Sequence, residues 1–193
     1  MRYLIILLLS TFVFGCSQTK YINPHVLITT NLGEIEIEVF SSKAPISSAA
    51  FLSFVDSGFY TKSSFYRVIM QEGLRASTNT GLIQGGIWQT NDKQHPSLTG
   101  IIHESTLTTG LSHVSGTVSL ARTKPGTATS EFFICIGDQT QFDYGNKNGE
   151  DSVGFAAFGS VFKGMSIVRK IQEQRRHNQD FDEKITIDKI ERL

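Results

Sequence analysis

The chain has 193 residues, and its 18 Lys and Arg balance 18 Asp and Glu, so the formal net charge is zero. This length suits one domain. A content of 39% hydrophobic and 19% charged residues is typical of a folded protein rather than a disordered one. Nucleic acid is excluded as the main partner, because phosphate binding needs an excess or a cluster of positive charge.

The first residues have the pattern of an export signal. Arg2 precedes an apolar run over residues 3–14, which is shorter than the roughly 20 apolar residues of a membrane-spanning helix and has the length of a secretory signal. The run ends in VFGC, residues 13–16, which resembles a bacterial lipobox. We therefore expect 1–15 to be a signal peptide and 16–24 a lipidated cysteine followed by a short tether. The alternative is an ordinary signal peptide with an incidental cysteine.

The two cysteines agree with this interpretation. A lipid on Cys16 predicts a lipoprotein of the cell envelope, anchored to the membrane at the periplasmic or outer-membrane face. Cys135 is the other cysteine, so no intrachain disulfide can form once Cys16 is lipidated. Cys135 lies in the apolar run FFICI, and we predict that it is a buried hydrophobic residue rather than a nucleophile.

The remaining chain reads as short strands with few helices. The segment 34–40 alternates strictly between apolar residues and glutamates, which indicates a strand with one solvated face. Helices are predicted from Pro45 to Gly58 and from Gly164 to about Arg176. The stretch 90–116 is rich in turns. Strands are predicted at 25–30, 34–40, 65–69, 117–122, 131–136, 155–162 and 184–190. Because strands and helices do not alternate, the pattern favours an antiparallel barrel over a doubly wound sheet.

The common catalytic motifs are absent from the sequence: there is no HExxH, GxGxxG, P-loop, GxSxG or CxxC. His103 and His113 could be metal ligands, although turn-capping histidines are the simpler interpretation. A Ser/His/Asp triad remains open in a chain with many serines, yet no serine lies on a recognisable nucleophile elbow. We therefore predict no metal and no cofactor.

Six fragments carry a family resemblance, and they occur in one order along the chain: FYRVI at 65–69, IQGG at 83–86, SLAR at 119–122, SEFFI at 130–134, FAAFG at 155–159 and GM at 164–165. In that order the chain resembles the cyclophilin-type peptidyl-prolyl cis/trans isomerases, from about His25 to Ile190. The resemblance implies a mainly β domain over 25–193, a closed eight-stranded antiparallel β-barrel with two flanking α-helices. It also implies a monomer that binds proline-containing polypeptides.

The resemblance assigns a role to individual residues. Arg67 matches the family's catalytic arginine, and Phe133 would form the floor of the proline pocket. The residues that match positions along the peptide groove are Phe65, Leu82, Gln84, Ala121, Arg122, Glu131, Phe133, Phe142 and Phe155. Glu131 is also expected to lie beside Arg67 and to accept from its guanidinium.

Some positions depart from the family's pattern. Gly81 and Gln141 stand where relatives have aromatic residues, and Glu131 stands where they usually have glutamine. Similarly, Arg122 replaces an asparagine and Phe155 a histidine. The expected function is acceleration of Xaa-Pro rotation in exported proteins, which assists their folding. The alternative, which these departures favour, is a proline-peptide-binding adaptor or chaperone of low activity on the same barrel.

Overall fold

The computed structural model describes residues 21–90, 98–146 and 151–193. The predicted signal peptide (1–15) and Cys16 lie outside the described residues. Tyr21, the first described residue, stacks on His25 with 3.6 Å between ring centroids and meets the edge of Phe162. The last part of the predicted tether is therefore packed against the domain.

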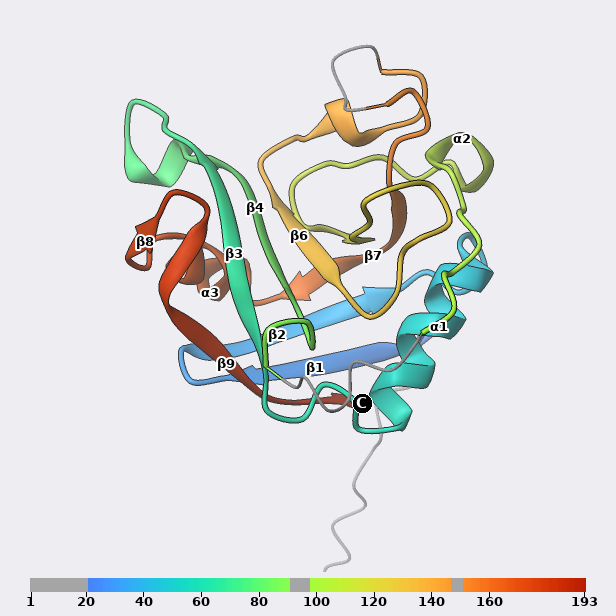
Figure 1. Cartoon of the computed structure of the whole chain (residues 1–193), viewed down its shortest axis with the longest axis horizontal. Helices are drawn as coiled ribbons and strands as arrows, with labels where there is room; N and C mark the ends of the chain where they lie inside the picture. The colour runs from blue at the N-terminus through green and yellow to red at the C-terminus, as the bar shows by residue number, and fades with distance from the viewer. Residues whose placement is uncertain (1–20, 91–97, 147–150) are drawn as a thin grey trace, which may run out of the picture.

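Eight strands of the described chain close into an antiparallel barrel, as the sequence predicted (Figure 1). Their order is β1-β2-β7-β5-β6-β4-β3-β9, and the barrel closes because β9 pairs with both β3 and β1. A short strand, β8, pairs with β9 outside the ring. The strands are β1 (His25–Thr30), β2 (Gly33–Val39), β3 (Ser63–Gln71), β4 (Thr80–Gly86), β5 (Thr117–Leu120), β6 (Phe132–Ile136), β7 (Ala156–Lys163), β8 (Arg176–His177) and β9 (Asp180–Arg192).

The two predicted helices flank the barrel on opposite sides (Figure 1). Helix α1 (Pro45–Asp56) packs on β7 and β9, and its first residue suits the opening turn because proline has a fixed φ and no N–H to leave unpaired. Helix α3 (Met165–Gln172) packs on β2, β3, β4 and β6 and ends earlier than predicted, before the turn into β8.

Three shorter elements occur in the connections. Helix α2 (Thr106–Thr109) lies in the turn-rich stretch, and two 3₁₀ turns, η1 (Ala76–Thr78) and η2 (Thr140–Phe142), lie in other loops. Across the described ranges, no helix has both the length and the apolar character needed to cross a bilayer.

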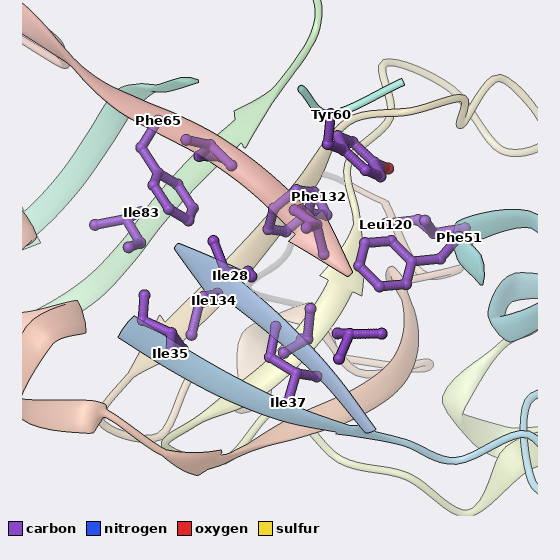
Figure 2. Packing of buried hydrophobic residues seen from close by; sticks show 14 of the residues in the cluster. Ile28, Ile35, Ile37, Phe51, Tyr60, Phe65, Ile83, Leu120, Phe132 and Ile134 are labelled. Atoms are coloured by element: carbon purple, nitrogen blue, oxygen red, sulfur yellow. The ribbon is translucent and has the colours of Figure 1, made fainter. Parts of the chain in front are cut away.

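The barrel interior is filled by every second residue of the strands. On β6, Phe132, Ile134 and Ile136 belong to the main core, whereas Phe133 and Cys135 belong to a separate apolar cluster outside it. Figure 2 shows Phe132 and Ile134 in this core. The two-residue period of a strand thus directs one face of β6 to the main core and the other face to this second cluster.

The expectation for Phe65 was wrong, because its side chain lies in the core and not in a groove. It is fully buried and meets Phe132 edge to face at 5.8 Å (Figure 2). The cause is a bulge in β3: Phe65 pairs with Gly85 and Arg67 with Gln84, so Tyr66 is an extra residue. Strict alternation would place Phe65 and Arg67 on one face, whereas the bulge lets Arg67 turn outward while Phe65 stays inside.

Candidate active site

A row of residues crosses the outer face of four neighbouring strands. Arg67 on β3 pairs with Gln84 on β4, Gln84 with Phe133 on β6, and Phe133 with Ser119 on β5. Residues paired across strands point to the same face, and each step is about 4.8 Å. The backbones of Arg67 and Phe133 are therefore about 10 Å apart, and the carboxamide of Gln84 lies between the two residues.

The apolar part of this face is built around Phe133. Leu82, Phe133 and Cys135 are buried in one cluster, and the half-buried residues packed against it are Ile69, Ala121, Phe142 and Phe155. Phe133 meets Phe142 at 5.6 Å and Phe155 at 5.4 Å, both edge to face. Edge-to-face contacts are a favourable arrangement of aromatic rings and hold the three rings together. The structure thus brings together the predicted residues Leu82, Ala121, Phe133, Phe142 and Phe155.

The cluster has no reactive nucleophile. Cys135 is fully buried, as predicted. Burial raises the pKa of its thiol, and the negative charge of the nearby Asp143 carboxylate raises it further. A thiol that stays protonated is a poor nucleophile.

Two glutamines hold the guanidinium of Arg67. Its Nη1 donates to Oε1 of Gln84 at 3.2 Å, and its Nε donates to Oε1 of Gln179 at 3.0 Å, with Nη2 donating to the same oxygen. Gln179 lies between β8 and β9, 112 residues further along the chain. No motif in the sequence marks Gln179, because only the closure of the barrel brings it to Arg67.

Gln84 is itself held by a chain of hydrogen bonds that ends on Glu131. Nε2 of Gln84 donates to the Tyr66 hydroxyl at 2.9 Å, and that hydroxyl donates to Oε2 of Glu131 at 2.6 Å. The other carboxylate oxygen accepts from the backbone N–H groups of Ile87 and Trp88. Every bond from Arg67 to Glu131 therefore runs in one direction, from donor to acceptor.

The predicted contact between Glu131 and Arg67 was wrong. No hydrogen bond between these two side chains occurs in the described part of the chain. Glu131 precedes β6, which pairs with β4 and β5 and not with β3. Glu131 is instead connected to Arg67 through the hydrogen bonds of Tyr66 and Gln84.

The Glu131 carboxylate packs directly against Gly86, where a side chain would leave no room for it. Gly86 has φ +145°, and a Cβ there would lie 2.4 Å from the Glu131 oxygens. Burial raises the pKa of Glu131, while its bonds to Tyr66, Trp88, Ile87 and Ser130 oppose this. Burial also raises the pKa of Tyr66, with Glu131 adding to the effect, so the hydroxyl remains a donor.

The Arg122 side chain forms part of the wall of the site and is not free in the groove. Its guanidinium lies 4.7 Å above the ring of Phe155, donates to the carbonyl of Gly154 and pairs with Asp151 at 2.9 Å. Only 3% of the side chain is exposed. A planar cation suits this position because it stacks on the ring and bonds at its edge together.

The side chains of Ser119, His113 and Asp143 contact one another in the same order as in the catalytic triad of a hydrolase. Nδ1 of His113 lies 2.6 Å from Oδ1 of Asp143, and Nε2 lies 3.1 Å from Oγ of Ser119. Since a carboxylate only accepts, Nδ1 carries the proton and Nε2 accepts from the serine. However, Ser119 and His113 are both fully buried, so Ser119 Oγ cannot reach a substrate. The arrangement is therefore structural.

His113 supports the floor of the site from behind. Its ring lies nearly parallel to Phe133 with 5.9 Å between centroids. Burial lowers the pKa of His113, and Asp143 opposes this, so the ring is neutral at neutral pH. His103 does not join it in a metal site: within the described ranges, no group of three or more His, Cys, Asp or Glu could hold a metal ion.

Comparison with known proteins shows which family the chain belongs to. The family model described as cyclophilin type peptidyl-prolyl cis-trans isomerase/CLD matches residues 25–192. The chain belongs to this family. It is therefore a peptidyl-prolyl cis-trans isomerase, which rotates Xaa-Pro bonds in polypeptides.

Bacterial relatives of this family cover most of the chain. A peptidyl-prolyl cis-trans isomerase of Acinetobacter baylyi is 41% identical over 150 residues, which are 77% of this chain and 72% of that protein. Isomerase A of Dickeya dadantii is 34% identical over 175 residues, or 90% of this chain and 84% of that protein. Isomerase B of Escherichia coli is 36% identical over 150 residues, or 76% of this chain and 83% of that protein.

A solved structure has the same fold. The crystal structure of a cyclophilin-type isomerase from Cryptosporidium parvum superposes with a TM-score of 0.67 at 22% identity, covering 89% of this chain and 98% of the other. At this identity the likeness concerns the fold, and it agrees with the closed barrel described above.

Proposed function

We propose that this isomerase catalyses Xaa-Pro rotation with Arg67 as its catalytic residue and the cluster around Phe133 as its proline site. The observation that carries the proposal is the row Arg67–Gln84–Phe133, which places a fixed guanidinium about two strand spacings from an aromatic floor. A proline ring resting on Phe133 brings the bond before it toward Arg67.

The chemistry needs neither a nucleophile nor a proton transfer. Rotation about the peptide bond is slow because amide resonance resists it, with a barrier of about 20 kcal/mol. In the twisted peptide the nitrogen regains a lone pair, and a donor that meets it stabilises the twisted form alone. Arginine suits this role because it is always charged and presents several donors in a rigid fork. The bonds to Gln84 and Gln179 hold that fork before the substrate arrives, which limits the reorganisation needed during rotation.

Arg67 does not supply the whole acceleration. A 10⁵-fold increase in rate corresponds to roughly 7 kcal/mol, and one hydrogen bond to a charged group contributes about 1.5–3 kcal/mol. The remainder comes from binding the proline ring against the apolar cluster in a geometry that fits the twisted peptide better than either planar form.

The decisive experiment compares Arg67→Ala with the parent in a proline-peptide isomerisation assay. We expect kcat/KM to fall roughly 10- to 150-fold, the equivalent of that one bond. Arg192→Ala is the matched control, because Arg192 pairs with Asp56 on helix α1 and contacts no residue of the row. If a folded Arg67→Ala protein isomerises peptides as fast as the parent, Arg67 is not the catalytic residue.

We further propose that the protein acts on exported polypeptides, as a monomer held in the cell envelope by a lipid on Cys16. The support is the sequence VFGC at residues 13–16 after an apolar run, together with a domain whose described part begins to pack at Tyr21. A single acyl chain anchors weakly, whereas several hold firmly. Replacement of Cys16 by Ser is expected to abolish incorporation of labelled fatty acid and membrane retention. Unchanged labelling of this variant would contradict the anchor.

A further inference from the structure

The turn between β8 and β9 lies against the strand that carries the arginine. The backbone N–H of Val68 donates to the carbonyl of Gln179 at 2.7 Å, and Arg67 pairs with Asp180 in the register of β3 and β9. The next pair along these strands joins Phe65 to Ile185. The register thus shifts strongly at the bulge, and the β8–β9 hairpin reaches the position beside Arg67.

The conformation of the turn directs one side chain toward the arginine. Asn178 has φ +56°, a left-handed conformation that asparagine tolerates better than most residues and that suits a tight hairpin. Gln179 follows it, and its Oε1 accepts from both Nε and Nη2 of Arg67. This bidentate edge contact leaves Nη1 for Gln84. The fork is thus held from two sides, by the barrel wall and by the hairpin.

We propose that Gln179 is a positioning residue of the isomerase, acting through Arg67 and not through the substrate. This inference rests on the proposed catalytic role of Arg67. An unheld arginine side chain samples many rotamers, and the bonds to Gln179 confine it before the substrate binds. Gln179 keeps the charge on the arginine undiminished because its carboxamide is neutral. The hairpin is therefore part of the catalytic apparatus, although it lies outside the closed ring of strands.

Two substitutions remove the acceptor in different ways. Gln179→Ala shortens the side chain, and Gln179→Met keeps its length without an acceptor oxygen. We expect both to lower kcat roughly three- to tenfold, the equivalent of one modest hydrogen bond, with KM within about twofold of the parent. Gln179→Glu restores the acceptor and should bring back at least part of the lost kcat. Gln174→Ala is the matched control, because its Nε2 donates to the carbonyl of Lys170, away from Arg67. We expect it to behave as the parent.

A double-mutant cycle separates positioning from other effects. In an Arg67→Ala background, Gln179→Ala should change kcat by less than about twofold, because its target is gone. The Nε–H signal of Arg67 in a nitrogen-15 spectrum should exchange slowly with water in the parent and in Gln179→Glu, and rapidly in Gln179→Met.

The outcomes distinguish this inference from the proposed function. Full kcat in both Gln179→Ala and Gln179→Met would overturn the inference, as would an equal loss in Gln174→Ala or an undiminished loss in the Arg67→Ala background. In each of these cases Arg67 can still be catalytic. An Arg67→Ala protein with parental activity would instead refute the proposed role of Arg67, whatever Gln179 does.

Discussion

The hydroxyl of Tyr66 connects the buried carboxylate of Glu131, through Gln84, to Arg67, the proposed catalytic residue. The substitution Tyr66→Phe removes this hydroxyl with little change of shape. In the parent, this hydroxyl donates to Glu131 at 2.6 Å and accepts from Gln84 at 2.9 Å. Without it, Glu131 loses one donor to a buried charge, which costs about 1.5–3 kcal/mol of unfolding free energy. Gln84 also loses the acceptor that orients its carboxamide toward Arg67.

Tyr60→Phe is a matched control for this prediction. Tyr60 is buried in the core, and its hydroxyl donates to the uncharged carbonyl of Ser130 at 2.8 Å. A neutral bond of this kind contributes about 0.5–1.5 kcal/mol. Urea unfolding at neutral pH should therefore show a larger loss for Tyr66→Phe than for Tyr60→Phe. Only Tyr66→Phe should lower kcat/KM, by roughly two- to tenfold, because only it leads to Arg67.

The pH dependence of the stability deficit gives a second test. The Tyr66 bond favours the ionised form of Glu131 and so opposes the increase in its pKa that burial causes. Tyr66→Phe therefore raises the pKa of folded Glu131 further above the ordinary value. A folded state that holds its proton to higher pH loses stability as pH rises, so the deficit should be full at neutral pH and shrink on acidification. Equal stability of the two tyrosine variants at neutral pH, or full activity of Tyr66→Phe, would refute the hydrogen-bond chain.

Three further predictions follow from buried contacts. Burial lowers the pKa of His113, so its contribution to stability is intact above pH 6.5, the ordinary value, and is lost as pH falls toward the lowered one; His113→Asn should flatten this part of a pH series of urea titrations. Gly81→Ala should destabilise the fold by more than about 1 kcal/mol in the same assay, because φ is +129° and the added Cβ would lie 2.0 Å from the carbonyl of Ile69. Arg122→Lys should raise KM for proline peptides severalfold with a smaller change in kcat, because a lysine cannot both stack on Phe155 and bond at its edge.

Much of the architecture was determined by local patterns that are visible in the sequence. The strict alternation at 34–40 predicted a strand with one solvated face. Strand β2 occupies nearly that range, but Glu36 is buried between His25 and Lys163, so its face is only partly solvated. Proline at position 45 marked the first residue of α1. The family resemblance of the fragments around Leu82 and Phe133 placed these two residues in one site, and the structure has them in one apolar cluster.

Other features were decided only by the tertiary structure, because they depend on register and chain closure. The bulge at Tyr66 reverses the facing of Phe65 relative to Arg67, and no local pattern distinguishes it from regular alternation. Gln179 reaches Arg67 across 112 residues only because the last strand closes the barrel. The hydrogen bond of Glu131 to Tyr66, and not to Arg67, also depends on the tertiary structure. Hydrogen bonds form only where donor and acceptor lie within about 3 Å, and the sequence sets those distances only through the assembled fold.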